Sequence, residues 1–108
     1  MNTNVTGLLL LEELQELHLS HQVDTIIACF PDMYGRLVGK RLTSRFFMNH
    51  IRQDGMHVCD YLLACDVEMD PVPGYQFTNW ERGYGDVHLR PDLSTLRLAS
   101  WLPKTAMV

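Results

Sequence analysis

Two histidines near the start of the chain have the spacing of a metal-binding pair. His18 and His21 are three positions apart in a segment with helical periodicity, so both imidazoles could reach one metal ion. No third ligand stands nearby in the sequence, and polar pairs at this spacing are common on solvated helix faces. We therefore expect no metal site here.

Three acidic residues alternate at the start of a long segment without periodicity. Asp66, Glu68 and Asp70 match the first, third and fifth ligands of a calcium-binding loop. The sixth position would be Pro71 where such a loop needs glycine, and the twelfth would be Phe77 where it needs glutamate. We interpret the three acids as the solvated edge of a strand that runs into a loop.

Other catalytic patterns lack their supporting residues. Gly83 and Gly85 are followed by neither a lysine nor a helix start, so they do not form a phosphate-binding loop. No Ser–His–Asp or Cys–His arrangement has a local signature, and the separation of Asp60, Asp66 and Asp86 in space cannot be derived from their spacing. The glycines are explained by loop or hairpin geometry.

The composition is that of a single globular domain. The chain has 108 residues, of which 46% are hydrophobic and 20% charged, with no room for a barrel or a doubly wound nucleotide domain. A net charge of −4 argues against a nucleic-acid-binding face. The longest apolar run, residues 8–11, is far too short to cross a membrane. Three cysteines without a CxxC pair, and no secretory signal, indicate the reducing cytoplasm.

Hydrophobic periodicity and turn residues predict two helices and several strands. We expect helices over 7–20 and 44–53, and strands over 23–30, 36–42, 56–63, 86–89, 96–101 and 105–108. Thr43 or Ser44 should cap the second helix and Gly55 should end it. Its apolar face would consist of Phe46, Phe47, His50 and Ile51. This order predicts an α+β fold in which helices cover one face of one sheet.

The segment from Asp66 to Gly85 has no clear periodicity. It is about twenty residues long, and unstructured loops of more than roughly 12–15 residues in a compact domain are usually functional or disordered. We treat it as a candidate site. The residue pattern alone leaves the activity open.

Several motifs together resemble one family. They are the hairpin motif at 32–40, the segment 59–63, the Gly-Tyr-Gly-Asp at 83–86, the Arg-Pro-Asp-Leu-Ser-Thr-Leu at 90–96, and the Trp-Leu-Pro-Lys-Thr-Ala at 101–106. In this order they resemble the N-terminal β-grasp domain of the glutamine synthetase family. The resemblance implies an α+β, β-grasp (ubiquitin-like) mixed sheet with one helix packed on a face over 22–108, preceded by an N-terminal helical extension over 1–21.

The resemblance also implies an activity for the whole enzyme. Family members are ATP-dependent ligases that activate the γ-carboxylate of glutamate as γ-glutamyl phosphate, which ammonia or an amine then attacks. They use ATP with Mg²⁺ or Mn²⁺, held mainly by a following catalytic domain that this chain lacks, so we expect no cofactor on this chain alone. They form homo-oligomeric rings, here expected to be dodecamers, in which this domain closes the active site of the neighbouring subunit.

Two residues take roles from the resemblance. Asp60 matches the aspartate that family members present to the incoming ammonium, where a carboxylate can stabilise a cation and accept a proton. The alternative for Asp60 is a strand residue paired with an arginine or a backbone donor. Trp80 matches a tryptophan beside the nucleotide and cation site, or it packs on the sheet. Asp86, Pro91 and Asp92 also match family positions, but turn geometry explains them.

The chain departs from the ammonia-using pattern beside Asp60. That pattern continues with Gly-Ser-Ser and soon reaches the tryptophan, whereas this chain has Tyr61-Leu62-Leu63 followed by the long loop. A bulkier, more apolar segment suits an alkylamine or a polyamine. The chain therefore resembles the γ-glutamylamide or γ-glutamylpolyamine synthetase branch, with ammonia as the alternative nucleophile.

A different class of function remains open. The chain could be a stand-alone, non-catalytic β-grasp module that binds a partner through a strand edge, or a non-catalytic structural relative of the synthetases. The last four residues, 105–108, end on apolar side chains in mid-strand. This favours a fragment of a longer ligase, inactive by itself, over a complete binding module.

Overall fold

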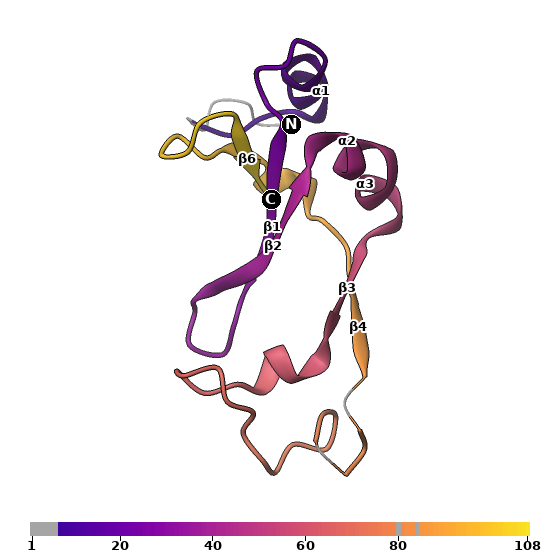
Figure 1. The fold of residues 1–108 in the computed structure, drawn as a ribbon, viewed down its shortest axis with the longest axis vertical. Helices are drawn as coiled ribbons and strands as arrows, with labels where there is room; N and C mark the ends of the chain where they lie inside the picture. Colours follow the sequence, from indigo (N-terminus) through magenta and orange to yellow (C-terminus); the bar gives the residue numbers. More distant parts are fainter. Residues whose placement is uncertain (1–6, 80, 84) are drawn as a thin grey trace.

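The computed structural model describes residues 7–79, 81–83 and 85–108. The molecule is elongated, with principal extents of 48 × 27 × 25 Å and a radius of gyration of 15.8 Å, against about 13 Å for an ordinary domain of this size. Helices and a sheet occupy one end (Figure 1), and two antiparallel ribbons run from there towards a long loop at the other end.

The described residues form short helices and strands in an α+β order. The helical segments are α1 (Leu11–Leu19), α2 (Ser44–Phe46), the π-helical turn η1 (Phe47–Ile51), α3 (Arg52–Asp54), and the 3₁₀ turns η2 (Asp60–Ala64) and η3 (Leu93–Thr95). The strands are β1 (Thr25–Pro31), β2 (Leu37–Thr43), β3 (Met56–Cys59), β4 (Asp86–Leu89), β5 (Arg97–Leu98) and β6 (Thr105–Met107). Among these helices none is long and apolar enough to cross a membrane.

The main sheet is mixed, as the β-grasp resemblance predicts. Its strand order is β2-β1-β6-β5, with β1 antiparallel to β2 and parallel to β6, and β5 antiparallel to β6. The β1–β2 hairpin pairs throughout, and Gly39 lies opposite Cys29. A Cβ on Gly39 would overlap the carbonyl oxygen of Ala28, so the close approach of the two strands requires glycine here. The observed architecture is consistent with a β-grasp-like fold.

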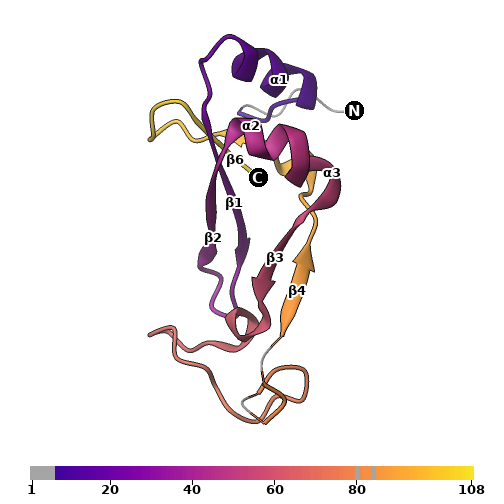
Figure 2. The ribbon, with the colours of Figure 1, turned by 45° about the vertical axis from the view of Figure 1, so that its right-hand side comes forward.

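The expectation of one sheet was wrong, because β3 and β4 form a separate two-stranded ribbon. Gly55 ends the second helix, as predicted, with a φ of +73°. The chain leaves this residue away from the main sheet, and β3 pairs with β4 instead (Figure 2). Met56 and Val58 are buried while His57 is exposed, and this alternation cannot reveal which strand is the partner.

Two predicted strands are shorter than expected. The strand predicted over 56–63 ends at Cys59, and the next five residues form η2. Tyr61, Leu62 and Leu63 are all half-buried, which suits a tight helical turn rather than alternating burial. The strand predicted over 96–101 is limited to β5, because Ala99 and Leu102 join in a turn that leads back to β6.

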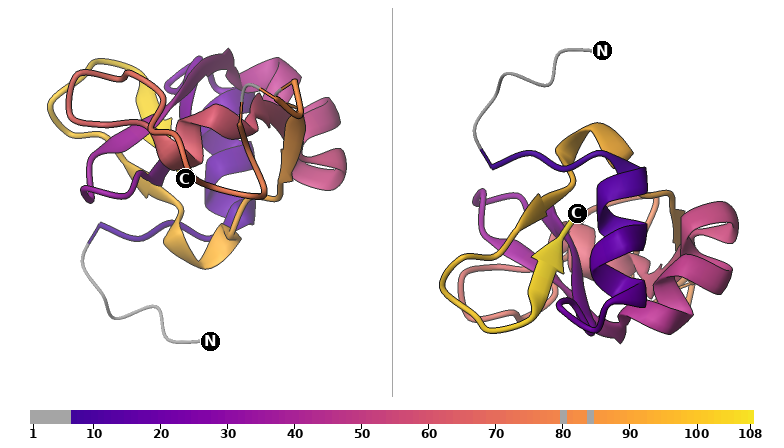
Figure 3. Two further views of the ribbon diagram at one scale, coloured as in Figure 1. Left: turned by 90° about the horizontal axis from the view of Figure 1, so that it is seen from below. Right: turned by 90° about the horizontal axis from the view of Figure 1, so that it is seen from above.

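Both helices contribute to one core. Figure 3, viewed along the long axis, shows α1 next to the helix of residues 44–54. Leu14 of α1 and Phe47 of the second helix are fully buried, together with Ile26 of β1. The same cluster contains Val23, Ala28, Met48, Ile51, Met56, Val58, Leu96 and Ala106. Thr43 caps the second helix by accepting a hydrogen bond from the Phe46 N–H at 3.1 Å, as expected.

The predicted apolar face of the second helix was partly wrong. Phe47 and Ile51 are buried, but Phe46 and His50 are exposed and their rings lie 5.1 Å apart on the surface. Met48 is buried in their place. Phe47, Met48 and Ile51 keep ordinary helical spacing, so the buried stripe is the predicted one rotated by about one position around the helix.

Candidate functional site

Asp60 lies where the β3–β4 ribbon ends. The last strand pair joins Cys59 to Asp86, and the next link is the Asp60 N–H, which donates to the carbonyl oxygen of Gly85 at 2.8 Å. Asp60 then begins η2, so it is not the mid-strand residue that was expected. Its side chain is largely buried, with 9% of its surface exposed. Strand pairing therefore fixes the backbone of this acid next to the end of the long loop.

The Asp60 carboxylate is bound by the long loop. The hydroxyl of Thr78 donates to Asp60 Oδ1 at 2.7 Å, and both residues are buried. The other oxygen, Oδ2, lies near Gly85, where an added Cβ would be 3.8 Å from it. The alternative reading of Asp60 invoked an arginine or a backbone donor, and the partner that the described residues supply is this hydroxyl instead. The contact brings the candidate acid and the candidate loop into one site.

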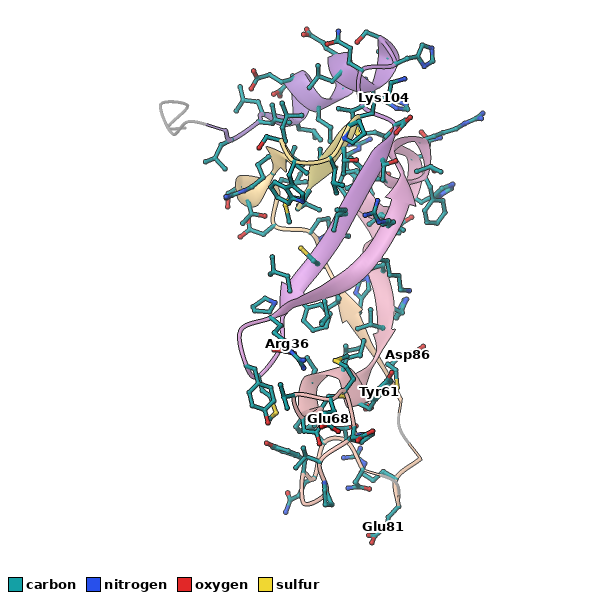
Figure 4. The ribbon with its side chains drawn as sticks, turned by 60° about the vertical axis from the view of Figure 1, so that its left-hand side comes forward. Arg36, Tyr61, Glu68, Glu81, Asp86 and Lys104 are labelled. Carbon is teal, nitrogen blue, oxygen red and sulfur yellow. The ribbon has the colours of Figure 1, made fainter. Side chains whose placement is uncertain are left out.

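Of the other residues matched by resemblance, those that the structure describes form no hydrogen bond with the Asp60 side chain. Trp80 lies outside the described residues. Asp86 is exposed at the start of β4, on the same end of the molecule as Tyr61 (Figure 4). Asp92 caps η3, and hydrogen bonds from the side chain and backbone of Ser94 hold its pKa below the ordinary value, although partial burial opposes them. This capping role agrees with the expected turn geometry.

A side-chain clamp joins the tip of the β1–β2 hairpin to the long loop. Arg36 donates through Nε to Asp32 at 2.9 Å and through Nη2 to the carbonyl oxygen of Asp66 at 3.0 Å. Its Nη1 donates to the carbonyl oxygen of Val67. Figure 4 shows Arg36 at the hairpin tip, facing the segment that carries Glu68. The clamp ties the first turn of the loop to the main sheet.

The acid of this clamp has a perturbed pKa. Burial alone would raise the pKa of Asp32, but hydrogen bonds from the N–H groups of Tyr34 and Arg36, together with the Arg36 guanidinium, outweigh it. The pKa of Asp32 therefore lies below its ordinary value. The ionised carboxylate holds the hairpin turn and orients the arginine.

Replacing Arg36 by methionine should loosen the loop. Arg36→Met keeps the apolar stem but removes the donors to Asp66 and Val67, so hydrogen exchange of the amides over 66–70 should become roughly tenfold faster. Hydrogen-exchange mass spectrometry measures this directly. Arg45→Met, at an exposed arginine on α2, is the matched control. Equal exchange in both variants would contradict the clamp.

Stability should depend on pH through Asp32. Because its folded-state pKa is lowered, ionised Asp32 stabilises the fold above its unfolded pKa of about 4, and this stabilisation is lost as the pH falls through the folded-state value. An asparagine at position 32 has no charge at any pH, so the Asp32→Asn variant lacks this pH-dependent stabilisation throughout. The difference in unfolding free energy between wild type and Asp32→Asn should therefore shrink as urea titrations move from about pH 6 to about pH 3. A constant difference would contradict the assignment.

The acidic and histidine motifs have structural partners. Asp66 Oδ1 accepts from the N–H groups of Glu68 and Asp70, which closes a tight turn. His18 Nδ1 lies 2.7 Å from the hydroxyl of Ser44 and links the two helices. Within the part of the chain that the structure describes, no three His, Cys, Asp or Glu side chains gather into a group that could hold a metal ion.

A cavity of about 250 Å³ lies away from Asp60. It is bounded by β1, the second helix and the segment after β4, with a mainly apolar lining that includes Cys29, Phe30, Met56 and Leu89. Burial raises the pKa of the Cys29 thiol, so this thiol is a poor nucleophile. The cavity therefore has the character of a packing gap between the two ribbons rather than of a reaction centre.

Two residues of the site were missed by sequence reasoning. Arg36 stood within the hairpin motif that supports the family resemblance, but its contact with a loop thirty residues away depends on the fold. Thr78 carried no signal, because a threonine in an aperiodic segment has no distinguishing pattern. The unusual length of the loop was the one sequence feature that indicated a function for this segment.

The chain is similar to three curated proteins. The gamma-glutamylethanolamide synthetase of Streptomyces coelicolor is 47% identical over 96 residues, which are 89% of this chain and 21% of the relative. A glutamate–isopropylamine ligase of a Pseudomonas species is 41% identical over 88 residues, or 82% of this chain and 19% of the relative. The type-1 glutamine synthetase 2 of Dictyostelium discoideum is 34% identical over 70 residues, or 65% and 13%. No protein-family model matches the chain.

The matched residues make up most of this chain but only a small part of each relative. The chain spans about a fifth of the length of the first two relatives. Its homologues are therefore enzymes of the glutamine synthetase family, and the small share of each that it matches is consistent with an N-terminal domain.

Proposed function

We propose that this chain is the N-terminal domain of a glutamine synthetase-type ligase that joins glutamate to an organic amine at the expense of ATP. The observation that carries the proposal is its identity of 47% and 41% to two relatives named for ethanolamide and isopropylamide formation. The proposed role of the domain is to present Asp60 to the amine in the active site of a neighbouring subunit.

The proposed reaction has two steps. A γ-carboxylate oxygen of glutamate attacks the γ-phosphorus of ATP, and ADP leaves with the electron pair of the broken P–O bond. The amine nitrogen then attacks the γ-carbonyl carbon of the acyl phosphate, phosphate leaves with the C–O electron pair, and the nitrogen loses a proton. The γ-glutamyl amide, ADP and phosphate are the products.

Asp60 fits the second step chemically. An amine arrives largely as its cation and must lose a proton before it can attack, and a carboxylate both attracts the cation and accepts that proton. The low exposure of Asp60 supports the role, because a charge interaction is stronger where little water screens it. We propose Trp80 as a neighbour of the nucleotide and the amine.

An organic amine fits the surroundings of Asp60 better than ammonia does. The residues after Asp60 are Tyr61, Leu62 and Leu63, all of them half-buried and mostly apolar. Such side chains can contact the carbon skeleton of an amine, from which ammonia would gain nothing. Both amine-ligase relatives match the chain over more of its length than the glutamine synthetase relative does.

The remaining parts of the ligase are assigned to other regions of the enzyme. We propose ATP with Mg²⁺ or Mn²⁺ as the activating pair, and because the described residues offer no group of ligands for a metal, we assign the metal to the catalytic domain. A homo-oligomeric ring, with a dodecamer as the expected form, would bring this domain to its neighbour. The three free cysteines support a reducing cytoplasm as the compartment.

Phosphate release by the full-length protein tests the proposal. The protein is incubated with ATP, Mg²⁺ and glutamate, and with ammonia, ethanolamine, isopropylamine or a polyamine in turn. We expect phosphate release that requires both glutamate and an amine. No phosphate release with any of these amines would contradict the ligase and leave the non-catalytic β-grasp module.

A further inference from the structure

We infer that Thr78 is a positioning residue, whose buried hydroxyl holds Asp60 Oδ1. None of the described residues donates to Oδ2, and we assign that oxygen to the amine. This inference rests on the proposed function, since it assigns a task to Asp60 in amine binding. Thr78 belongs to the long loop and to no sequence motif, so the loop would serve to deliver this hydroxyl to Asp60.

The burial of Thr78 is exceptional within its loop. Among the described residues of 66–85, Thr78 has the one buried side chain, with 1% of its surface exposed. Phe77, directly before it, is 46% exposed although it is far more hydrophobic. The hydrophobic effect alone would favour burial of the phenylalanine rather than of the threonine. The loop is therefore arranged around the polar contact between Thr78 and Asp60.

The contact has the chemistry of an orienting bond. A threonine hydroxyl has one proton to donate, and Thr78 donates it to Asp60 Oδ1 at 2.7 Å, a normal O–H···O distance. With Oδ1 bound, rotation of the carboxylate is restricted. Oδ2 lies on the side of Gly85, which carries no side chain to cover it.

The loop holds Thr78 in place from both sides. Asn79 donates through Nδ2 to the carbonyl oxygen of Tyr75 at 2.8 Å, and its Oδ1 accepts from the Arg82 N–H at 2.7 Å. Further back, the N–H of Val72 donates to the carbonyl oxygen of Ala64 at 2.7 Å. These bonds fasten the loop to η2 and close a turn next to Thr78, so the hydroxyl is preorganised.

Three substitutions at Thr78 in the full-length ligase test the inference. Thr78→Val keeps the shape and removes the hydroxyl, Thr78→Ser keeps the hydroxyl, and Thr78→Ala removes the hydroxyl without added bulk. We expect Thr78→Val and Thr78→Ala to raise the KM for the amine roughly tenfold, with the KM for glutamate and for ATP unchanged. Thr78→Ser should restore the wild-type KM. Thr95→Val, which removes an exposed hydroxyl bonded to the Asp92 carbonyl at 2.7 Å, is the matched control.

The outcomes separate this inference from the proposed function. If Asp60→Asn abolishes amine use while Thr78→Val and Thr78→Ala keep the wild-type amine KM, the positioning role is wrong and the function stands. If Asp60→Asn has no effect, the proposed role of Asp60 fails whatever Thr78 does. Should Thr78→Val fold poorly in thermal unfolding, the comparison of Thr78→Ala with Thr78→Ser decides. Equal rises in the KM for all three substrates would also overturn the inference.

Discussion

Asp60→Asn in the full-length protein is expected to lower kcat/KM for the amine by about a hundredfold or more. Asparagine keeps the size of the side chain and an oxygen that can still accept from Thr78, so the fold should survive. It removes the negative charge that attracts the amine cation and the base that takes its proton. Steady-state kinetics with the preferred amine, at fixed ATP and glutamate, measure the loss.

Asp24→Asn is the control for this change. Asp24 is also a carboxylate that accepts from a threonine hydroxyl, at 2.9 Å from Thr25, but it is exposed and lies directly before β1. We expect its kinetics to match the wild type within about twofold. If Asp60→Asn were as active as Asp24→Asn, the candidate site would be wrong.

Phe47→Ala is expected to cost about 4 kcal/mol of unfolding free energy, because the ring is fully buried in the shared core. The adjacent Phe46→Ala serves as its control. Phe46 is 46% exposed, so the same chemical change should cost well under half as much. Urea unfolding followed by circular dichroism compares the two. Equal losses would mean that the helix buries a different face.

The Phe46–Phe47 pair shows what the sequence could reveal about the fold. Helical periodicity correctly located the helix, its cap at Thr43 and its end at Gly55, because these depend on residues within one turn. It could not separate the buried phenylalanine from the exposed one, since a stripe through Phe46 and His50 and a stripe through Phe47 and Ile51 both have helical spacing. The pairing of β3 with β4 was missed for a related reason, because alternation reports a buried face and not a partner.

In the candidate site too, local features could be predicted from the sequence and contacts between distant segments could not. Asp60 was identified through a resemblance, and its neighbourhood in the sequence indicated an apolar site for an amine. Thr78 lies 18 positions from its partner Asp60, and Arg36 lies 30 positions from its partner Asp66. Both contacts therefore form only when the loop folds back. Aperiodic segments carry no pattern that predicts such contacts. The length of the loop indicated a function but not the residue that performs it.

Competition between nucleophiles tests the central claim most directly. The full-length protein is given ATP, Mg²⁺, glutamate and equal concentrations of ammonia and ethanolamine, and the products are separated by mass spectrometry. An organic-amine ligase predicts γ-glutamylethanolamide as the main product. Glutamine as the main product, or neither amide, would contradict the account.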